Sequence, residues 1–72
     1  MKKTKITSKT FSNSSIITKI TYSENEEIME VTFVNNQVYS YRGVPIQVWE
    51  AALSTESIGK FFHSEIKGKY SS

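Results

Sequence analysis

Apolar and polar residues alternate in two stretches of the first half of the chain, and this pattern predicts β-strands. In residues 16–22, one extended face carries Ile16, Thr18, Ile20 and Tyr22, and the other carries Ile17, Lys19 and Thr21. Residues 29–33 alternate in the same way, with Met29, Val31 and Phe33 on the apolar face. Such alternation is typical of an antiparallel sheet with one face in water.

A third strand is predicted over residues 37–42, where Tyr39 and Tyr41 share one face. It follows Asn35 and Asn36, and asparagine tolerates a positive φ better than most other residues. We therefore expect these two asparagines to occupy the central positions of a type I′ turn that closes a hairpin.

The second half of the chain changes to the three- and four-residue spacing of helices. Gly43 permits a turn, and Pro45 suits the first turn of a helix because it lacks an N–H. The buried face of this helix is predicted to hold Ile46, Trp49, Ala52 and Leu53. Ser57 is a good N-cap for a second helix, whose inward residues are Ile58, Phe61, Phe62, Ile66 and Tyr70. The predicted fold is α+β, a three-stranded antiparallel β-meander followed by two short helices packed on one face.

The length of 72 residues fits one domain with a thin core, because a chain this short buries only about 60% of its unfolded surface. The chain has no cysteine, so neither disulfides nor thiolate zinc sites can add to its stability. Packing of aliphatic and aromatic side chains must supply it.

The net charge of +2 is unevenly distributed. Four of the nine basic residues lie near the N-terminus, at Lys2, Lys3, Lys5 and Lys9, and residues 10–72 carry a net charge of −2. We interpret residues 1–13 as a flexible basic N-terminal tail and residues 14–72 as a single domain. The chain has neither the apolar core of a secretory signal nor a membrane-spanning run, so we expect a cytoplasmic protein without a membrane partner.

Catalytic and metal-binding residues are sparse. The chain has no aspartate and a single histidine, His63, so a Ser-His-acid triad would need a distant glutamate. His63 and Glu65 are two residues apart on a predicted helix and point in different directions, which argues against a metal pair. We expect no enzymatic activity, no metal and no cofactor, and we interpret the glutamates of residues 24–30 as solubilising.

The start of the second predicted helix is one candidate ligand site. Its first backbone N–H groups lack intrahelical acceptors, and the helix dipole favours an anion there. Gly59 would let a phosphate approach the backbone, Lys60 adds a positive charge, and Ser57 precedes them. The alternative is that Ser57 only caps the helix and Gly59 relieves a tight helix-helix contact. We include His63 among the ligand-binding candidates, although a surface helix residue is its simpler interpretation.

The third predicted strand and the turn after it provide a second candidate site, at Tyr39, Tyr41, Arg42 and Gly43. Tyrosine rings can stack on bases, and a guanidinium can bind phosphate or stack as well. The alternative is that the tyrosines are core residues, covered by Trp49 and by Phe61 or Phe62.

Residues 15–70 resemble the KTSC domain, a family of small free-standing bacterial and phage proteins that is also found at the C-terminus of some lysyl-tRNA synthetases. The matching features are Tyr39-Ser40-Tyr41, Gly43-Val44-Pro45, Trp49 and Leu53, Ser57-x-Gly59-x-Phe61-Phe62, Ile66 and Tyr70. Ser54-Thr55-Glu56 departs from the alanine that the family often has before the serine. The resemblance implies this fold and an RNA-binding role.

We therefore expect a non-enzymatic binding module for RNA or another phosphate-bearing ligand. One alternative is a small-molecule module that sequesters a nucleotide or cyclic-nucleotide signal in phage-host conflict. Another is a protein-interaction or self-association module, in which the first predicted strand pairs with a partner if it lies at a sheet edge.

Overall fold

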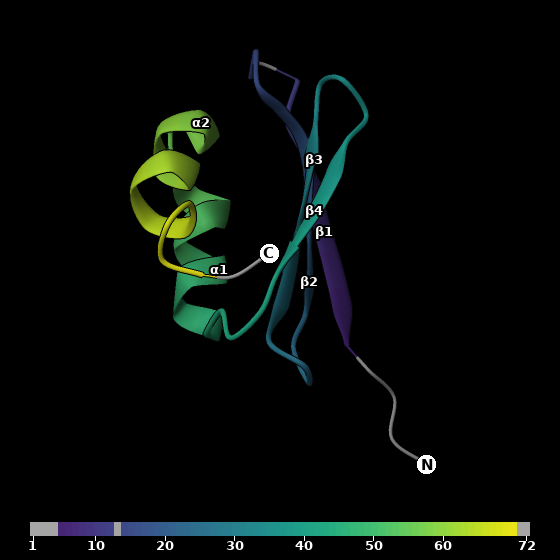
Figure 1. Ribbon diagram of the computed structural model, residues 1–72, viewed down its shortest axis with the longest axis vertical. Helices are drawn as coiled ribbons and strands as arrows, with labels where there is room; N and C mark the ends of the chain where they lie inside the picture. The colour runs from purple at the N-terminus through teal and green to yellow at the C-terminus, as the bar shows by residue number, and fades with distance from the viewer. Residues whose placement is uncertain (1–4, 13, 71–72) are drawn as a thin grey trace.

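The computed structural model describes residues 5–12 and 14–70 and forms an antiparallel sheet with two helical segments on one face (Figure 1). The described strands are β1 (Ile6–Thr10), β2 (Ile17–Ser23), β3 (Ile28–Phe33) and β4 (Val38–Tyr41). Each pairs with the next along the chain, in the order β1-β2-β3-β4. The predicted β-meander is confirmed, but it has four strands and not three.

The additional strand, β1, comes from the segment that the sequence predicts as a tail. Its residues are mostly polar and exposed, so apolar alternation gives no sign of it. It pairs along the whole of its length with β2, with Lys9 opposite the buried Ile20. Lys9 also holds the strand to α1 (Ile46–Ser54), because its Nζ donates a 2.6 Å hydrogen bond to the Leu53 carbonyl. Of the predicted tail, residues 1–4 and 13 lie outside the described residues.

The face assignment at the start of β2 is also wrong in the sequence prediction. Ile17, and not Ile16, is buried in the core together with Ile20 and Tyr22. The pairing register between β2 and β3 shifts between Ile17 and Lys19, which is a β-bulge or similar irregularity. An extra residue in one strand reverses the facing of the residues before it. Ile16 is consequently exposed at the sheet end.

The β3–β4 hairpin is confirmed, with a different turn. The Phe33 N–H donates to the Gln37 carbonyl, and the Asn36 N–H donates to the Phe33 carbonyl. Asn36 has a φ of +71°, whereas Asn35 is not in the left-handed region. This is a three-residue loop with one left-handed residue, so the two-residue type I′ turn is wrong. The Asn35 side chain instead accepts a hydrogen bond from the Gln37 N–H.

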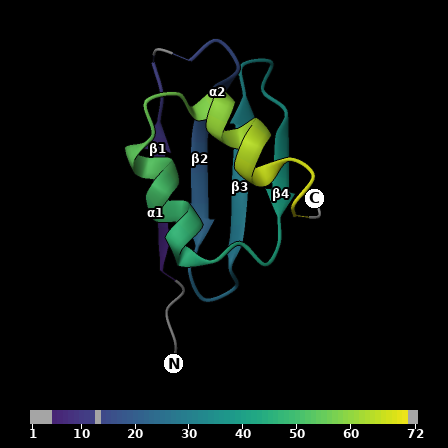
Figure 2. The ribbon, with the colours of Figure 1, turned by 90° about the vertical axis from the view of Figure 1, so that its left-hand side faces the viewer.

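Both predicted helices form on the same face of the sheet (Figures 1 and 2). Helix α1 begins directly after Pro45 and buries Trp49 and Ala52. The second helix begins at α2 (Ile58–Phe61) and continues without a break as the π-helical turn η1 (Phe62–Ile66), which buries Phe62 and Ile66. Viewed from the helix side, α1 lies over β1 and β2, and the α2–η1 segment runs toward β4 (Figure 2).

The core beneath α1 is closed and its polar atoms are paired. The rings of Tyr22 and Trp49 stack at 5.4 Å with an interplanar angle of 11°. The Tyr22 hydroxyl donates a 2.7 Å hydrogen bond to the Val44 carbonyl. Burial, with smaller contributions from Glu27 and Glu24, raises the pKa of Tyr22 above its ordinary value.

Across the described residues, no helix has the length and apolar character that a membrane crossing requires.

Candidate functional site

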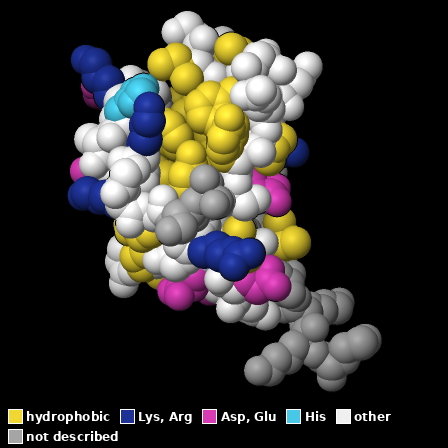
Figure 3. Space-filling view, viewed as in Figure 1, with side chains coloured by type: hydrophobic (Ala, Val, Ile, Leu, Met, Phe, Trp, Pro, Cys, Tyr) yellow, Lys and Arg dark blue, Asp and Glu magenta, His cyan; other side chains and the backbone are white. Residues whose placement is uncertain are grey.

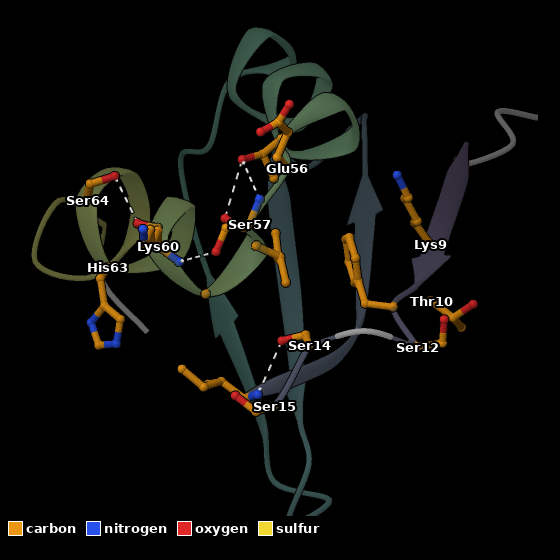
Figure 4. Close-up of a pocket in the computed structure, with 15 residues that line it drawn as sticks. Lys9, Thr10, Ser12, Ser14, Ser15, Glu56, Ser57, Lys60, His63 and Ser64 are labelled. Atoms are coloured by element: carbon orange, nitrogen blue, oxygen red, sulfur yellow. Dashed lines mark hydrogen bonds between the residues drawn. The ribbon is translucent and has the colours of Figure 1, made fainter.

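A surface groove of about 830 Å³ lies where the β1–β2 connection meets the α1–α2 connection and the start of α2 (Figure 4). Its walls come from segments that are far apart in sequence, at residues 9–12, 14–16, 55–60, 63 and 64. Phe11 and Ile16 give it an apolar part, and serine and threonine hydroxyls supply much of the rest. A groove of this kind can enclose a small polar ligand or a part of a longer one.

Lysine side chains line the groove on both walls. Lys60 and His63 come from the α2–η1 wall, and Lys9 comes from β1 on the other side (Figure 4). The Lys9 Nζ is anchored to the Leu53 carbonyl and lies 5.3 Å from the centre of the Phe11 ring. Lys60 and His63 are exposed, and Glu56 is the carboxylate among the lining residues. At neutral pH the two lysines and one glutamate leave a net positive charge in the groove.

Ser57 and Gly59 both have structural contacts at the start of α2. Ser57 caps the helix as predicted, because its Oγ accepts a 3.4 Å hydrogen bond from the Lys60 N–H. Gly59 packs against the β1–β2 connection, where an added Cβ would lie 3.2 Å from the Ile16 Cδ1. The predicted close contact at Gly59 is present, but its helix-helix nature is wrong, because the neighbour is a residue of the β1–β2 connection.

The two tyrosines of β4 share the helix-facing side of the sheet, because they pair with the buried Val31 and Met29. Tyr41 is a core residue, 7% exposed, and its ring meets the Phe62 ring edge-on at 5.7 Å. Burial, followed by the charge of Tyr39, raises the pKa of Tyr41. Tyr39 is 43% exposed. The sequence prediction of a shared face is correct, but the two rings differ in accessibility.

An aromatic cluster lies between the β3–β4 hairpin and η1. Phe33 contacts Tyr39 edge-on at 5.5 Å and Phe62 at 5.4 Å, and Phe62 contacts His63 at 5.8 Å. We call Phe33, Tyr39, Tyr41, Phe62 and His63 the aromatic cluster. The space-filling view shows hydrophobic side chains exposed in the gap between helices and sheet, bordered by positive and histidine side chains (Figure 3). His63 belongs both to this cluster and to the groove.

Arg42 and Gly43 lie at the other end of the sheet. Both are exposed, and Gly43 has a φ of +74° that allows the chain to turn toward α1. The backbone N–H of the next residue, Val44, donates a hydrogen bond to the backbone carbonyl of Glu27 in the β2–β3 connection. The groove instead adjoins the start of β2, and a strand of seven residues spans roughly 20 Å. Arg42 and Gly43 are therefore separate from Ser57, Gly59, Lys60 and His63.

Sequence reasoning missed Lys9, Phe11 and Ile16 as groove residues. It assigned Lys9 and Phe11 to the tail and Ile16 to the core face of a strand. The Lys9 side chain is held in place by its hydrogen bond to the carbonyl of Leu53, 44 residues away. The local sequence carries no signal of this contact.

A second concavity of about 760 Å³ lies between α1 and the α2–η1 segment. It shares Glu56, Ser57 and Lys60 with the groove and adds Glu65. In the described part of the chain, no three histidine or acidic side chains come together as metal ligands. Neither concavity therefore offers a metal-binding cluster among those residues.

A family model and a solved structure point to the same family. The family model of the KTSC domain matches residues 13–70. A crystal structure of a KTSC domain protein from Yersinia pestis superposes with a TM-score of 0.85 and 33% sequence identity, covering 93% of each chain. An uncharacterized protein of Stutzerimonas stutzeri (strain A1501) is 32% identical over 57 residues, which are 79% of this chain and 80% of that protein. The chain belongs to the KTSC domain family.

Proposed function

We propose that this KTSC domain is a non-enzymatic binding module for a phosphate-bearing ligand, with RNA as the favoured class. The observation that carries the proposal is the groove with Lys9 on one wall and Lys60 and His63 on the other. Positive groups around a concave surface attract phosphate oxygens and orient them. We propose a cytoplasmic setting, with which the lack of cysteine is compatible.

The location of the positive charge supports this site over the other candidate. His63 belongs both to the groove that Lys60 lines and to the aromatic cluster, so phosphate and base contacts are available from neighbouring surfaces. Arg42 lies at the opposite end of the sheet, next to the β2–β3 connection with its glutamates. The proposed phosphate site is therefore the groove, with Arg42 as a secondary contact for a ligand long enough to reach it.

The test is the salt dependence of binding of a fluorescent ten-nucleotide single-stranded RNA, measured by anisotropy. Lys60→Ala is expected to weaken binding about 2- to 5-fold, the worth of one exposed charge contact. The slope of log affinity against log salt is negative, and its magnitude is expected to decrease by about 0.7, as for one lost contact to a single strand.

Lys19→Ala is the matched control, because Lys19 is exposed and its neighbour Ile20 points into the core, which leaves Lys19 on the outer face of the sheet. It changes the net charge by the same amount without touching the groove. Equal binding by Lys60→Ala and Lys19→Ala would show that the groove is not the phosphate site.

A nucleotide-sequestering module is the second candidate function, favoured by the groove volume of about 830 Å³. Volumes of 300–1,000 Å³ are common for small-molecule sites. Saturable binding of a mononucleotide or cyclic nucleotide, without affinity for the RNA strand, would select this function.

A self-association module is the third, and the structure changes which strands it could use. The first predicted strand corresponds to β2, which lies between β1 and β3 and has no free edge. Pairing of that strand with a partner is therefore excluded, and β1 and β4 are the edge strands of the described sheet. Concentration-dependent sedimentation would select this function.

A further inference from the structure

The exposed ring of Tyr39 has the properties of a rigid platform. Its ring contacts Phe33 edge-on at 5.5 Å, and its hydroxyl donates a 3.3 Å hydrogen bond to the Gln37 side chain. Even so, the residue is 43% exposed, whereas Tyr41 on the same strand face is 7% exposed. A ring that is already held in place loses little conformational freedom when a ligand stacks on it.

Two sets of contacts link the Tyr39 ring to residues of the groove, although Phe62 between them is buried. The first runs through the rings, from Tyr39 to Phe33, Phe62 and finally His63, in contacts of 5.4–5.8 Å. The second runs along the backbone, because the Val34 N–H donates a 2.9 Å hydrogen bond to the backbone carbonyl of Ile16. The Ile16 side chain lines the groove. Figure 3 shows exposed hydrophobic side chains bordered by Lys or Arg and histidine side chains.

Flat rings beside lysines are complementary to a molecule that has both aromatic faces and phosphates. An internal base of a duplex has both faces covered by its neighbours, so it cannot stack on Tyr39 unless the duplex opens. We propose that Tyr39 is a stacking subsite for an unpaired base of a single-stranded nucleic acid whose backbone lies in the groove with Lys60 and His63. This inference rests on the proposed function and names the form of the ligand.

The test compares two ten-nucleotide probes with the same number of phosphates, a single-stranded RNA and an abasic strand. Stacking on an aromatic side chain contributes about 1–3 kcal/mol per base, so Tyr39→Leu is expected to weaken RNA binding about 5- to 150-fold. Its affinity for the abasic strand and its salt slope are expected to stay at the wild-type values. Tyr39→Phe, which keeps the ring, is expected to retain most of the RNA affinity.

The outcomes separate the subsite from the proposed function. If Lys60→Ala weakens RNA binding and Tyr39→Leu does not, the subsite is wrong and the phosphate groove stands. Equal loss of both probes in Tyr39→Leu would mean that the substitution disturbs the groove itself, which also overturns the stacking role.

Two further results would contradict the inference. If the matching RNA duplex binds as tightly as the single strand, or if AMP competes at the affinity of the ten-mer, the ligand is not a single strand. If wild-type protein binds neither probe, both the subsite and the proposed function fail. A thermal melt of each variant by circular dichroism checks that exposed Tyr39 can be replaced without unfolding.

Discussion

The two helical segments cover the same sheet in different ways. Under α1, Trp49 stacks flat on Tyr22, and the Tyr22 hydroxyl is paired with the Val44 carbonyl. Under η1, Phe62 meets the sheet rings edge-on, and Tyr39 stays 43% exposed. The first side is sealed, and the second is an open aromatic surface beside positive charge. We infer that the sealed side supplies stability and the open side is available for a ligand.

The sharpest test of this comparison is the truncation of one ring on each side. Trp49→Ala is expected to lower the free energy of unfolding by about 3–5 kcal/mol, as large-to-small core substitutions do. For a domain of this size, that is a large part of a total of about 4–11 kcal/mol. Tyr39→Ala is expected to cost about 1 kcal/mol or less because the ring is partly exposed. Urea denaturation followed by far-ultraviolet circular dichroism measures both, and equal losses would contradict the division into two sides.

A smaller effect is expected from Tyr22→Phe, which removes the buried hydroxyl and leaves the Val44 carbonyl without its 2.7 Å partner. The expected loss is about 1–3 kcal/mol in the free energy of unfolding.

The same substitution should alter the dependence of stability on alkaline pH. Burial raises the pKa of Tyr22 in the native state, so above about pH 10 the unfolded chain releases the phenolic proton first. Wild-type stability is therefore expected to fall as the pH rises through this range, and Tyr22→Phe should fall less steeply. Tyr41, whose pKa is also raised, contributes to the decline in both proteins. Identical pH profiles would show that Tyr22 is not responsible.

The smallest of these stability effects concerns β1, which forms one wall of the groove. Lys9→Met removes the 2.6 Å hydrogen bond to the Leu53 carbonyl while keeping an apolar stem. We expect a loss of about 1 kcal/mol, because the bond is only partly buried. Amide hydrogen exchange should accelerate in β1 and not at Met29 or Trp49, which lie in elements that do not pair with β1. Lys5→Met is the control, since Lys5 is exposed and precedes the strand.

Much of the sealed side could be predicted from the sequence, because its positions follow regular periods. Met29 and Val31 alternate along a strand, and Trp49 and Ala52 recur along a helix. The helix start at Ser57 was also predicted correctly, since N-capping is a local interaction.

The open side depends on features that lack such a period. The irregularity near Ile17 moves Ile16 from the predicted core face to the groove, and it is defined by pairing with β3. Strand β1 is held by pairing with the edge of β2 and by the Lys9 hydrogen bond to α1. Its polar composition is that of a solvent-exposed tail. The π-helical turn that brings Phe62 next to both Phe33 and His63 has no compositional signal. Tyr39, Lys60 and His63 were predicted from the sequence as members of two separate candidate sites. Their placement on one side of the molecule is visible only in the tertiary structure.

The most direct test of the central claim is an NMR titration of isotope-labelled protein with a short single-stranded RNA. We predict chemical-shift changes at Ile16, at residues 57–64 and in the Tyr39 ring, with the Trp49 indole unaffected. The same titration with mono- and cyclic nucleotides distinguishes sequestration of a small ligand. Changes confined to Arg42–Val44, or no change with any of these ligands, would contradict the assignment of the open side as the binding surface.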